Sequence, residues 1–352
     1  MTQRIIRIAL ALAGCILSTA GCIQNGGLDT DGTPIRFAAG STLLRNDATK
    51  AVPKNTFASG NCFLVYGRHN TDPSLVFTAR AVVLGASAWS YSDPEYWQWT
   101  GNSSDYYDFL ALYLGEADQS RQLPTPSCVP AQSPFSASVT YDPTVDQYDL
   151  MLAGERRNYA EGNGVVEMEF QHMLCAVRVK ITNGSSDTYF ILNGYHFENL
   201  VSSGTATVSA SYDAGGNPTL AWSSLSRTAI HFGGEADLVQ NLSGGNYYLN
   251  ALAYDLMIPQ DHTAKLGSDG WPAIVVNYTN QAGQAKSARA LLKDIPRRNS
   301  LLNIERWERG VVYDYEIELN LDGGILVNVT TTPWTRIEGE TPGLQLPEID
   351  LG

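Results

Sequence analysis

The residues of this chain that could do acid–base or metal chemistry are not grouped in any recognisable pattern. The five histidines stand singly along the sequence. There is no Gly-x-Ser-x-Gly elbow, no His-Glu-x-x-His pair and no glycine loop that could hold a phosphate. Carboxylates are frequent, so an exported hydrolase with an unrecognised carboxylate pair remains one hypothesis. Apart from that pair, the sequence predicts no catalytic residues, no metal site and no cofactor.

Cysteine chemistry is predicted at the N-terminus. Arg4 and Arg7 precede an apolar run over residues 8–17, and Ala20-Gly21 leads into Cys22. This order is typical of a bacterial lipoprotein signal, in which the cysteine thiol is acylated. Cys15 is the alternative lipid site, but it leaves too short an apolar core. We therefore predict a signal peptide over residues 1–22 and lipidation at Cys22.

Three further cysteines, Cys62, Cys128 and Cys175, allow at most one disulfide. Their spacing matches no metal-binding pattern, so we interpret them as small buried apolar residues.

Eight aromatic residues fall within 21 positions and form the densest cluster of the chain. Two interpretations are open. The rings could form an exposed platform on which sugars stack, or they could fill the core between two sheets. Aromatic residues are common in strands, which favours the core interpretation. The cluster consists of Trp89, Tyr91, Tyr96, Trp97, Trp99, Tyr106, Tyr107 and Phe109.

The elements that position these residues are predicted to be strands. Apolar residues alternate with polar ones, and Asp-Pro or Gly-rich turns recur, without any long helical pattern. Asp322-Gly323-Gly324, between residues 313–321 and 325–329, predicts a hairpin. The parity of the apolar residues changes near His172, which predicts a bulge there. The chain carries 23 Lys and Arg against 36 Asp and Glu, which disfavours nucleic acid as a partner.

The length of the chain predicts two domains. We expect a tether over residues 23–33, an N-terminal domain over residues 34–160, and a C-terminal domain with a tail over residues 161–352. The boundary is placed in the polar, glycine-containing stretch 155–164.

Several stretches in a fixed order resemble the fimbrillin (Mfa-like, FimA-like) family of Bacteroidetes surface pilins. The tyrosine- and tryptophan-rich run over residues 89–113 looks like the N-terminal domain of that family. The other stretches are Asp149-Leu150-Met151, the Phe170-x-His172-x-Leu174 strand, the segment Leu256-Met257-Ile258-Pro259-Gln260, and the closing strands that include Trp307-x-x-Gly310 and Pro333-Trp334.

The resemblance implies an all-β fold with two tandem transthyretin-like β-sandwich domains and a place in a fimbria at the outer membrane. It implies that an arginine-specific surface protease removes the first strand, and that a C-terminal strand of the next pilin subunit replaces it. Ile35 and Phe37 would belong to the removable strand, and Arg45 would be the cleavage site. The alternative for Arg45 is a solvated loop arginine, and the chain has Thr49-Lys50-Ala51 where the family often has Thr-Arg-Ala.

The predicted donor strand lies in the tail after Trp334. Its apolar residues are Leu344, Leu346, Ile349 and Leu351. The alternatives are an edge strand of the same subunit or a frayed end. As a whole, the sequence favours a pilin, stalk or tip, that also contacts a ligand on a host or bacterial surface. The runner-up is a surface glycan-binding lipoprotein that uses the aromatic cluster at 89–107.

Overall fold

The computed structural model describes most of the chain between residues 32 and 334. The described ranges are 32–39, 57–72, 74–115, 124–129, 134–145, 147–184, 189–231, 240–242, 247–249, 254–265, 270–298, 304–320 and 325–334. The predicted signal peptide, Cys22, Arg45 and the tail residues Leu344, Leu346, Ile349 and Leu351 lie outside them.

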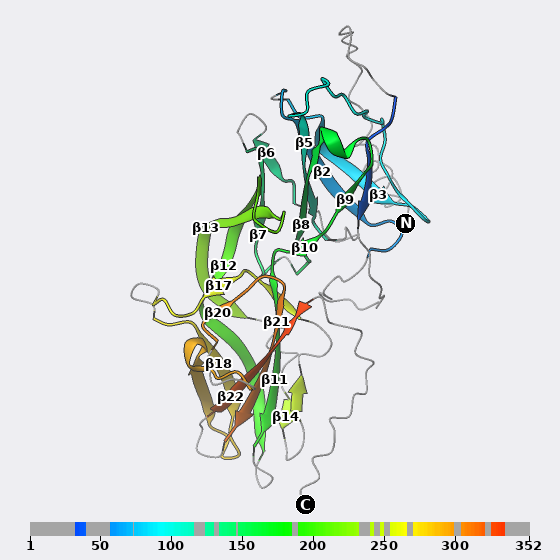
Figure 1. Cartoon of the computed structure of the whole chain (residues 1–352). Coiled ribbons are helices and arrows are strands. Elements are labelled where there is room, and N and C mark those ends of the chain that lie inside the picture. The colour runs from blue at the N-terminus through cyan, green and yellow to red at the C-terminus, as the bar shows by residue number, and fades with distance from the viewer. Residues whose placement is uncertain are drawn as a thin grey trace, which may run out of the picture.

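The predicted all-β fold is confirmed, and the described residues form an elongated stack of sheets (Figure 1). Two short 3-10 helices, η1 (Tyr159–Glu161) and η3 (Leu292–Asp294), are the helical elements of the described part. None of the described helices has the length and apolar character that a membrane crossing requires.

The upper sheet has six strands, and both of its faces are covered. Its order is β10 (Gln171–His172), β8 (Met151–Asn158), β5 (Tyr106–Tyr113), β2 (Cys62–His69), β3 (Phe77–Leu84) and β4 (Trp89–Ser90). Alternate residues of β5 enter two different cores. Phe109, Ala111 and Tyr113 pack in one core, whereas Leu110 and Leu112 pack in the other. Burial of both faces of the sheet therefore explains why β5 has apolar residues at odd and at even positions.

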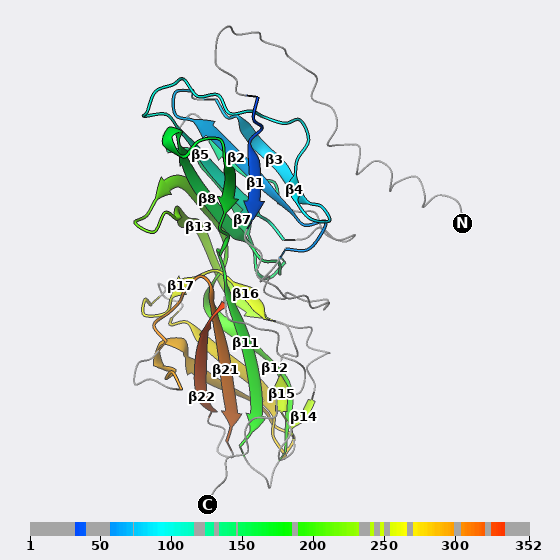
Figure 2. The same cartoon turned by 45° about the vertical axis from the view of Figure 1, so that its right-hand side comes forward.

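A seven-stranded sheet, which we name the shared sheet, extends along most of the molecule (Figure 2). Its order is β19 (Ala285–Leu291), β18 (Ala273–Thr279), β12 (Phe190–Tyr212), β7 (Ser136–Tyr141) and β6 (Ser127–Val129), and both β13 (Pro218–His231) and β14 (Gln240–Leu242) also pair with β12. The first part of β12 pairs with β18 and its last part pairs with β7. This one long strand therefore belongs to two sandwiches.

The lower sheet closes the second sandwich. It contains β15 (Tyr247–Leu249), β11 (Cys175–Asn183), β21 (Val311–Leu319) and β22 (Ile325–Pro333), with β16 (Asp255–Met257) beside β11. Its side chains Val177, Val179 and Tyr315 pack in one core with Leu192 and Ile274 of the shared sheet. Two further pairs of strands lie outside these sheets: β1 (Arg36–Ala39) with β9 (Val165–Met168), and β17 (Gln260–Asp261) with β20 (Arg306–Trp307).

The core between the upper sheet and the shared sheet is built by strands that precede residue 160 and by strands that follow it. Phe135, Leu150 and Leu110 share it with Val208 of β12 and with Trp334. The division into domains over 34–160 and 161–352 remains a prediction.

The predicted hairpin before and after residues 321–324 is confirmed, because β21 and β22 pair antiparallel from Leu319↔Ile325 to Val311↔Pro333. Near His172 the buried side chains change from one set of alternate residues to the other. The cause is the passage of the chain between sheets rather than a single bulge. The chain forms β9, then the short β10 beside β8, and then β11 in the lower sheet. Each step places the following residues against a different sheet, so the buried parity changes.

Candidate functional site

The first described strand, β1, is held by backbone hydrogen bonds on both of its edges. Along one edge it pairs in parallel with β9, with Phe37 opposite Val166. Along the other edge the Ile35 amide donates to the Glu95 carbonyl at 2.8 Å, and the Trp97 amide donates to the Thr33 carbonyl at 3.3 Å. Residues 33–39 are therefore inserted between two segments that come from distant parts of the sequence, and we call this place the β1 seat.

Two alternate side chains anchor β1 in its seat. Ile35 is 0% exposed and Phe37 is 5% exposed, whereas Arg36 between them faces solvent. The ring of Phe37 makes edge contacts with Phe77 at 5.3 Å and with Phe109 at 5.5 Å between centroids. This alternation is that of a strand with one buried face. That Ile35 and Phe37 belong to a removable strand stays a prediction.

Polar groups of the aromatic segment also mark the register of β1. The Tyr91 hydroxyl donates to the Ile35 carbonyl at 2.6 Å. Tyr107, which lies under the same segment, accepts from the Gln98 amide at 3.0 Å, and burial raises the pKa of its hydroxyl to about 12. Burial also raises the pKa of the Tyr91 hydroxyl. Both tyrosines therefore stay protonated at neutral pH and act as fixed hydrogen-bonding groups of the seat rather than as acid–base groups.

The aromatic cluster is largely core, as the favoured interpretation predicted. Trp97, Tyr107 and Phe109 are each at most 1% exposed. The Trp97 ring lies parallel to that of Trp99 at 5.3 Å, and Trp99 directs its indole N–H to Asn163. Trp89, Tyr91, Trp99 and Tyr106 are half-buried, and Tyr96 is the one member of the cluster classed as exposed. The rings therefore do not form a coplanar exposed platform.

A second polar site joins three of the stretches on which the family resemblance depends. The His172 ring nitrogen Nδ1 lies 2.9 Å from the Asp149 carboxylate, and the His172 ring stacks on Trp334 at 3.9 Å between centroids. The Trp334 amide donates to the Gly310 carbonyl, and the Gly310 amide donates to the Leu174 carbonyl. These contacts fix the end of β22 to the junction between the upper and lower sandwiches, and we name this place the junction.

Glutamine side chains tie a fourth stretch to the same region. The Gln147 side chain accepts from the Leu256 amide at 2.8 Å, and Gln260 accepts from the Val201 amide at 2.8 Å. Spacing along the sequence could not reveal these contacts, because the partners are more than 50 residues apart.

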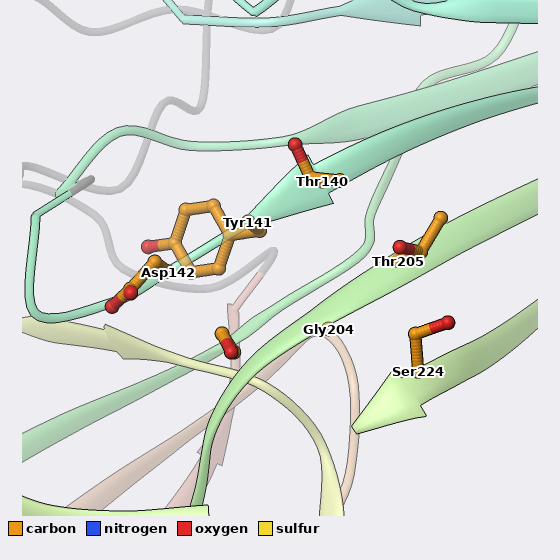
Figure 3. Close-up of a pocket in the computed structure, with 7 residues that line it drawn as sticks. Thr140, Tyr141, Asp142, Gly204, Thr205 and Ser224 are labelled. Carbon is orange, nitrogen blue, oxygen red and sulfur yellow. The ribbon is translucent and has the colours of Figure 1, made fainter. Parts of the chain in front are cut away.

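The small hollow drawn in Figure 3 lies where β7, β12 and β13 meet, with a volume of about 180 Å³. Its lining is mostly hydroxyl and backbone groups, from Thr140, Thr205, Ser203 and Ser224 among others. The single carboxylate, Asp142, already accepts from the amide and the hydroxyl of Thr144. The hollow offers no pair of acid and base groups, and the described residues contain no group of three or more potential metal ligands.

Within the described part of the chain, Cys62, Cys128 and Cys175 form no disulfide. Cys175 is fully buried, and burial raises the pKa of its thiol, which keeps it unreactive. Cys62 and Cys128 are half-buried.

The β9 side of the seat could not be read from the sequence. The alternation of Val166 and Met168 indicated a strand, but nothing in the residues indicated that its partner lies some 130 positions earlier, at 36–39. Parallel pairing over such a distance leaves no local signal.

Comparison with known proteins places these features in a family. A fimbrillin-like family model matches residues 49–334. A candidate cell adhesion protein of known structure from Bacteroides uniformis is 14% identical and aligns over 86% of this chain and 99% of that chain, with a TM-score of 0.48. A fimbrilin from Porphyromonas gingivalis is 7% identical and aligns over 86% of this chain and 97% of that chain, with a TM-score of 0.43. A search of curated proteins finds no match. Because the family model spans most of the sequence, including the aromatic cluster and the junction, this chain belongs to the fimbrillin-like family.

Proposed function

We propose that this protein is a pilin, a stalk or tip subunit of a cell-surface fimbria with a role in adhesion, and that it assembles by strand exchange at the β1 seat. Membership of the fimbrillin-like family supports a structural rather than a catalytic role. The observation that carries the mechanism is the way β1 is held, by two hydrogen-bonded edges and two buried side chains.

The proposed sequence of events begins with export as a lipoprotein, with the lipid on Cys22. An arginine-specific surface protease then cuts at Arg45, which follows Ala39 by six residues and precedes β2. After that cut β1 has no covalent link to the rest of the fold, and only its non-covalent contacts retain it. Loss of β1 exposes unpaired backbone groups and an apolar slot, which a strand from another chain can satisfy.

The donor we propose is the tail of another subunit, through Leu344 and Leu346 or through Ile349 and Leu351. Each pair repeats the spacing of Ile35 and Phe37, with one residue between the two apolar side chains. The first experiment is therefore a paired substitution. Leu344→Asp with Leu346→Asp, or Ile349→Asp with Leu351→Asp, should block filament growth of protease-treated protein, and Gln345→Asp should not.

Deletion of residues 344–352 is the complementary test. The deleted protein should fold and occupy a filament end, but no further subunit should follow it. Long filaments of protease-treated protein that lacks these residues would exclude the tail as donor and would favour a tip or accessory role.

Lipidation and cleavage can be tested separately. Cys22→Ala should move the protein from membrane to soluble fractions, and persistent membrane association with Cys15 intact would contradict the choice of Cys22. Arg45→Ala should leave a full-length precursor on the cell surface, whereas Lys50→Ala, the matched control, should be processed like the unmodified protein.

A further inference from the structure

The direction of β1 determines which end of the molecule must meet its neighbour in a fibre. β1 begins near the upper end of the molecule and runs toward the lower sandwich, parallel to β9 (Figure 2). Parallel and antiparallel ladders place their hydrogen bonds differently, so a strand that replaces β1 and keeps its bonds to β9 must run in the same direction. A donor that continues from the end of another subunit then enters the seat at the Pro34 end.

Exposed apolar side chains surround this entrance. Tyr96 forms a backbone bridge with Pro34 and is 42% exposed. Val165 lies opposite Arg36 across the parallel ladder and is also 42% exposed. Tyr159, in η1, is 40% exposed and contacts Trp99 edge-on at 5.6 Å. We name Tyr96, Tyr159 and Val165 the entry rim.

The entry rim holds a large share of the exposed apolar side chains. Three of the nine large apolar side chains that are exposed in the described part of the chain belong to it. The rim is also tied together: the Arg157 guanidinium donates to the Val165 carbonyl, and the Trp99 indole N–H donates to Asn163, just after η1. Exposed apolar side chains beside a binding site are typical of a protein interface.

The position of Trp334 indicates what covers the rim. β22 runs from the lower end of the molecule to the junction, where Trp334 is fully buried (Figure 1). To reach a neighbour that lies beyond the lower end, a tail that leaves from there would have to return along the lower sandwich. That sandwich is nine residues long in β21, or about 30 Å at about 3.3 Å per residue. An extended chain would use about nine residues over that length, which would make Leu344 one of the first residues able to enter a neighbour's seat.

We propose that the entry rim is a second contact between subunits, and that its occupant is the lower end of the copy that donates the tail. The inference rests on the strand exchange proposed above. The described strand ends mark that lower end: β11 ends at Asn183, opposite Leu319 of β21, and Leu319 pairs with Ile325 of β22. One surface that meets a different surface of the next copy makes a heterologous contact, which produces an open filament along the long axis.

The direction of entry is tested with a synthetic peptide of residues 342–352 and protease-treated protein that carries Tyr96→Cys. A thiol-reactive chloroacetyl group on the N-terminus of the peptide should cross-link to Cys at position 96, and the same group at the C-terminus should not. Val145→Cys, in an exposed turn, is the control. Cross-linking by the C-terminal group alone would overturn the inference, because the donor would then enter from the opposite end.

The rim contact is tested with Tyr159→Glu, because Tyr159 is the rim residue that lies outside the two segments that pair with residues 33–39. Its affinity for the peptide should stay within about twofold, while its rate of polymerisation should fall at least about tenfold, as expected when central apolar residues of an interface become charged. Val145→Glu is the matched control and should polymerise normally. Normal polymerisation of the rim variant would overturn the inference and leave strand exchange standing. If unmodified protein neither bound the peptide nor polymerised after cleavage, strand exchange itself would fall, and the inference with it.

Discussion

Replacement of Phe37 by Ala tests whether β1 is held in its seat by side-chain burial. Phe37 is 5% exposed and its ring contacts Phe77, Phe109 and Tyr91. Truncation of a buried Phe to Ala usually costs about 3–5 kcal/mol. Edge-to-face ring pairs account for about 0.5–1.5 kcal/mol each of such losses beyond the area buried. We therefore expect the uncleaved chain to lose about 3 kcal/mol of the free energy that keeps β1 in place.

The loss need not appear in full as global unfolding. A terminal strand can detach while the rest of the fold persists. The loss in the free energy of global unfolding therefore cannot exceed the free energy needed to detach β1. The assay therefore combines urea unfolding, followed by tryptophan fluorescence, with hydrogen exchange of the Ile35 and Trp97 amides. Both amides donate across the edge between residues 33–35, which lead into β1, and residues 95–97. Their exchange should accelerate about 100-fold for every 2.7 kcal/mol lost.

Arg36→Ala is the matched control, since Arg36 lies on the same strand with its side chain in solvent. Its effect should stay within about 0.5 kcal/mol. If Phe37→Ala costs less than about 1 kcal/mol and leaves the two amides protected, the seat is not held by Phe37. The backbone bonds alone would then account for the position of β1.

Three further outcomes are expected. Trp97→Ala should lower the free energy of unfolding by about 3 kcal/mol or more, as truncation of a buried aromatic does; an unchanged melting temperature with loss of glycan binding would favour the sugar-platform hypothesis. His172→Ala should cost about 1–3 kcal/mol in urea unfolding, because it removes a hydrogen-bond partner of the buried Asp149 carboxylate. Burial lowers the pKa of His262 from 6.5 to about 4, against the opposing effects of the Ile304 backbone and Asp261. The unfolded chain then binds this proton more readily, so stability should fall by about 3 kcal/mol as the pH drops from 6.5 to 4. His262→Leu should flatten that dependence.

Local patterns predicted the local elements well. The Gly-rich turn after residue 321 and the alternation on both sides of it predicted the β21–β22 hairpin, because register and turn chemistry act over a few residues. Burial of Trp97 and Phe109 followed from the preference of aromatic residues for strands that face a core. Ile35 and Phe37 were predicted to belong to a short removable strand; both side chains are buried, and the removal of the strand stays a prediction.

The sequence alone could not predict which strands pair when they are far apart along the chain. The step in parity near His172 was visible, but one bulge and a crossing from one sheet to another produce the same step. Only the partners distinguish them: β8 for β10, and β21 for β11. The two roles of β12 could not be predicted either. This strand of 23 residues pairs with β18 at one end and with β7 at the other, and neither pairing leaves a local signal in the sequence.

The junction was hidden for a similar reason. Asp149, His172 and Trp334 were each part of a stretch that resembles the family, yet nothing in their spacing placed them together. Their contact explains why those stretches belong together physically. A carboxylate, an imidazole and an indole fix the root of the tail at the middle of the molecule.

The measurement that tests the central claim most directly is a cryo-electron microscopy structure of the assembled fibre, formed from protease-treated protein. Strand exchange predicts that residues 33–39 of each subunit are gone from its own seat. It also predicts that a strand of the adjacent subunit, from residues 344–351, lies between β9 and residues 95–97, parallel to β9. A fibre in which every subunit retains its own Ile35 and Phe37 in the seat would contradict this account.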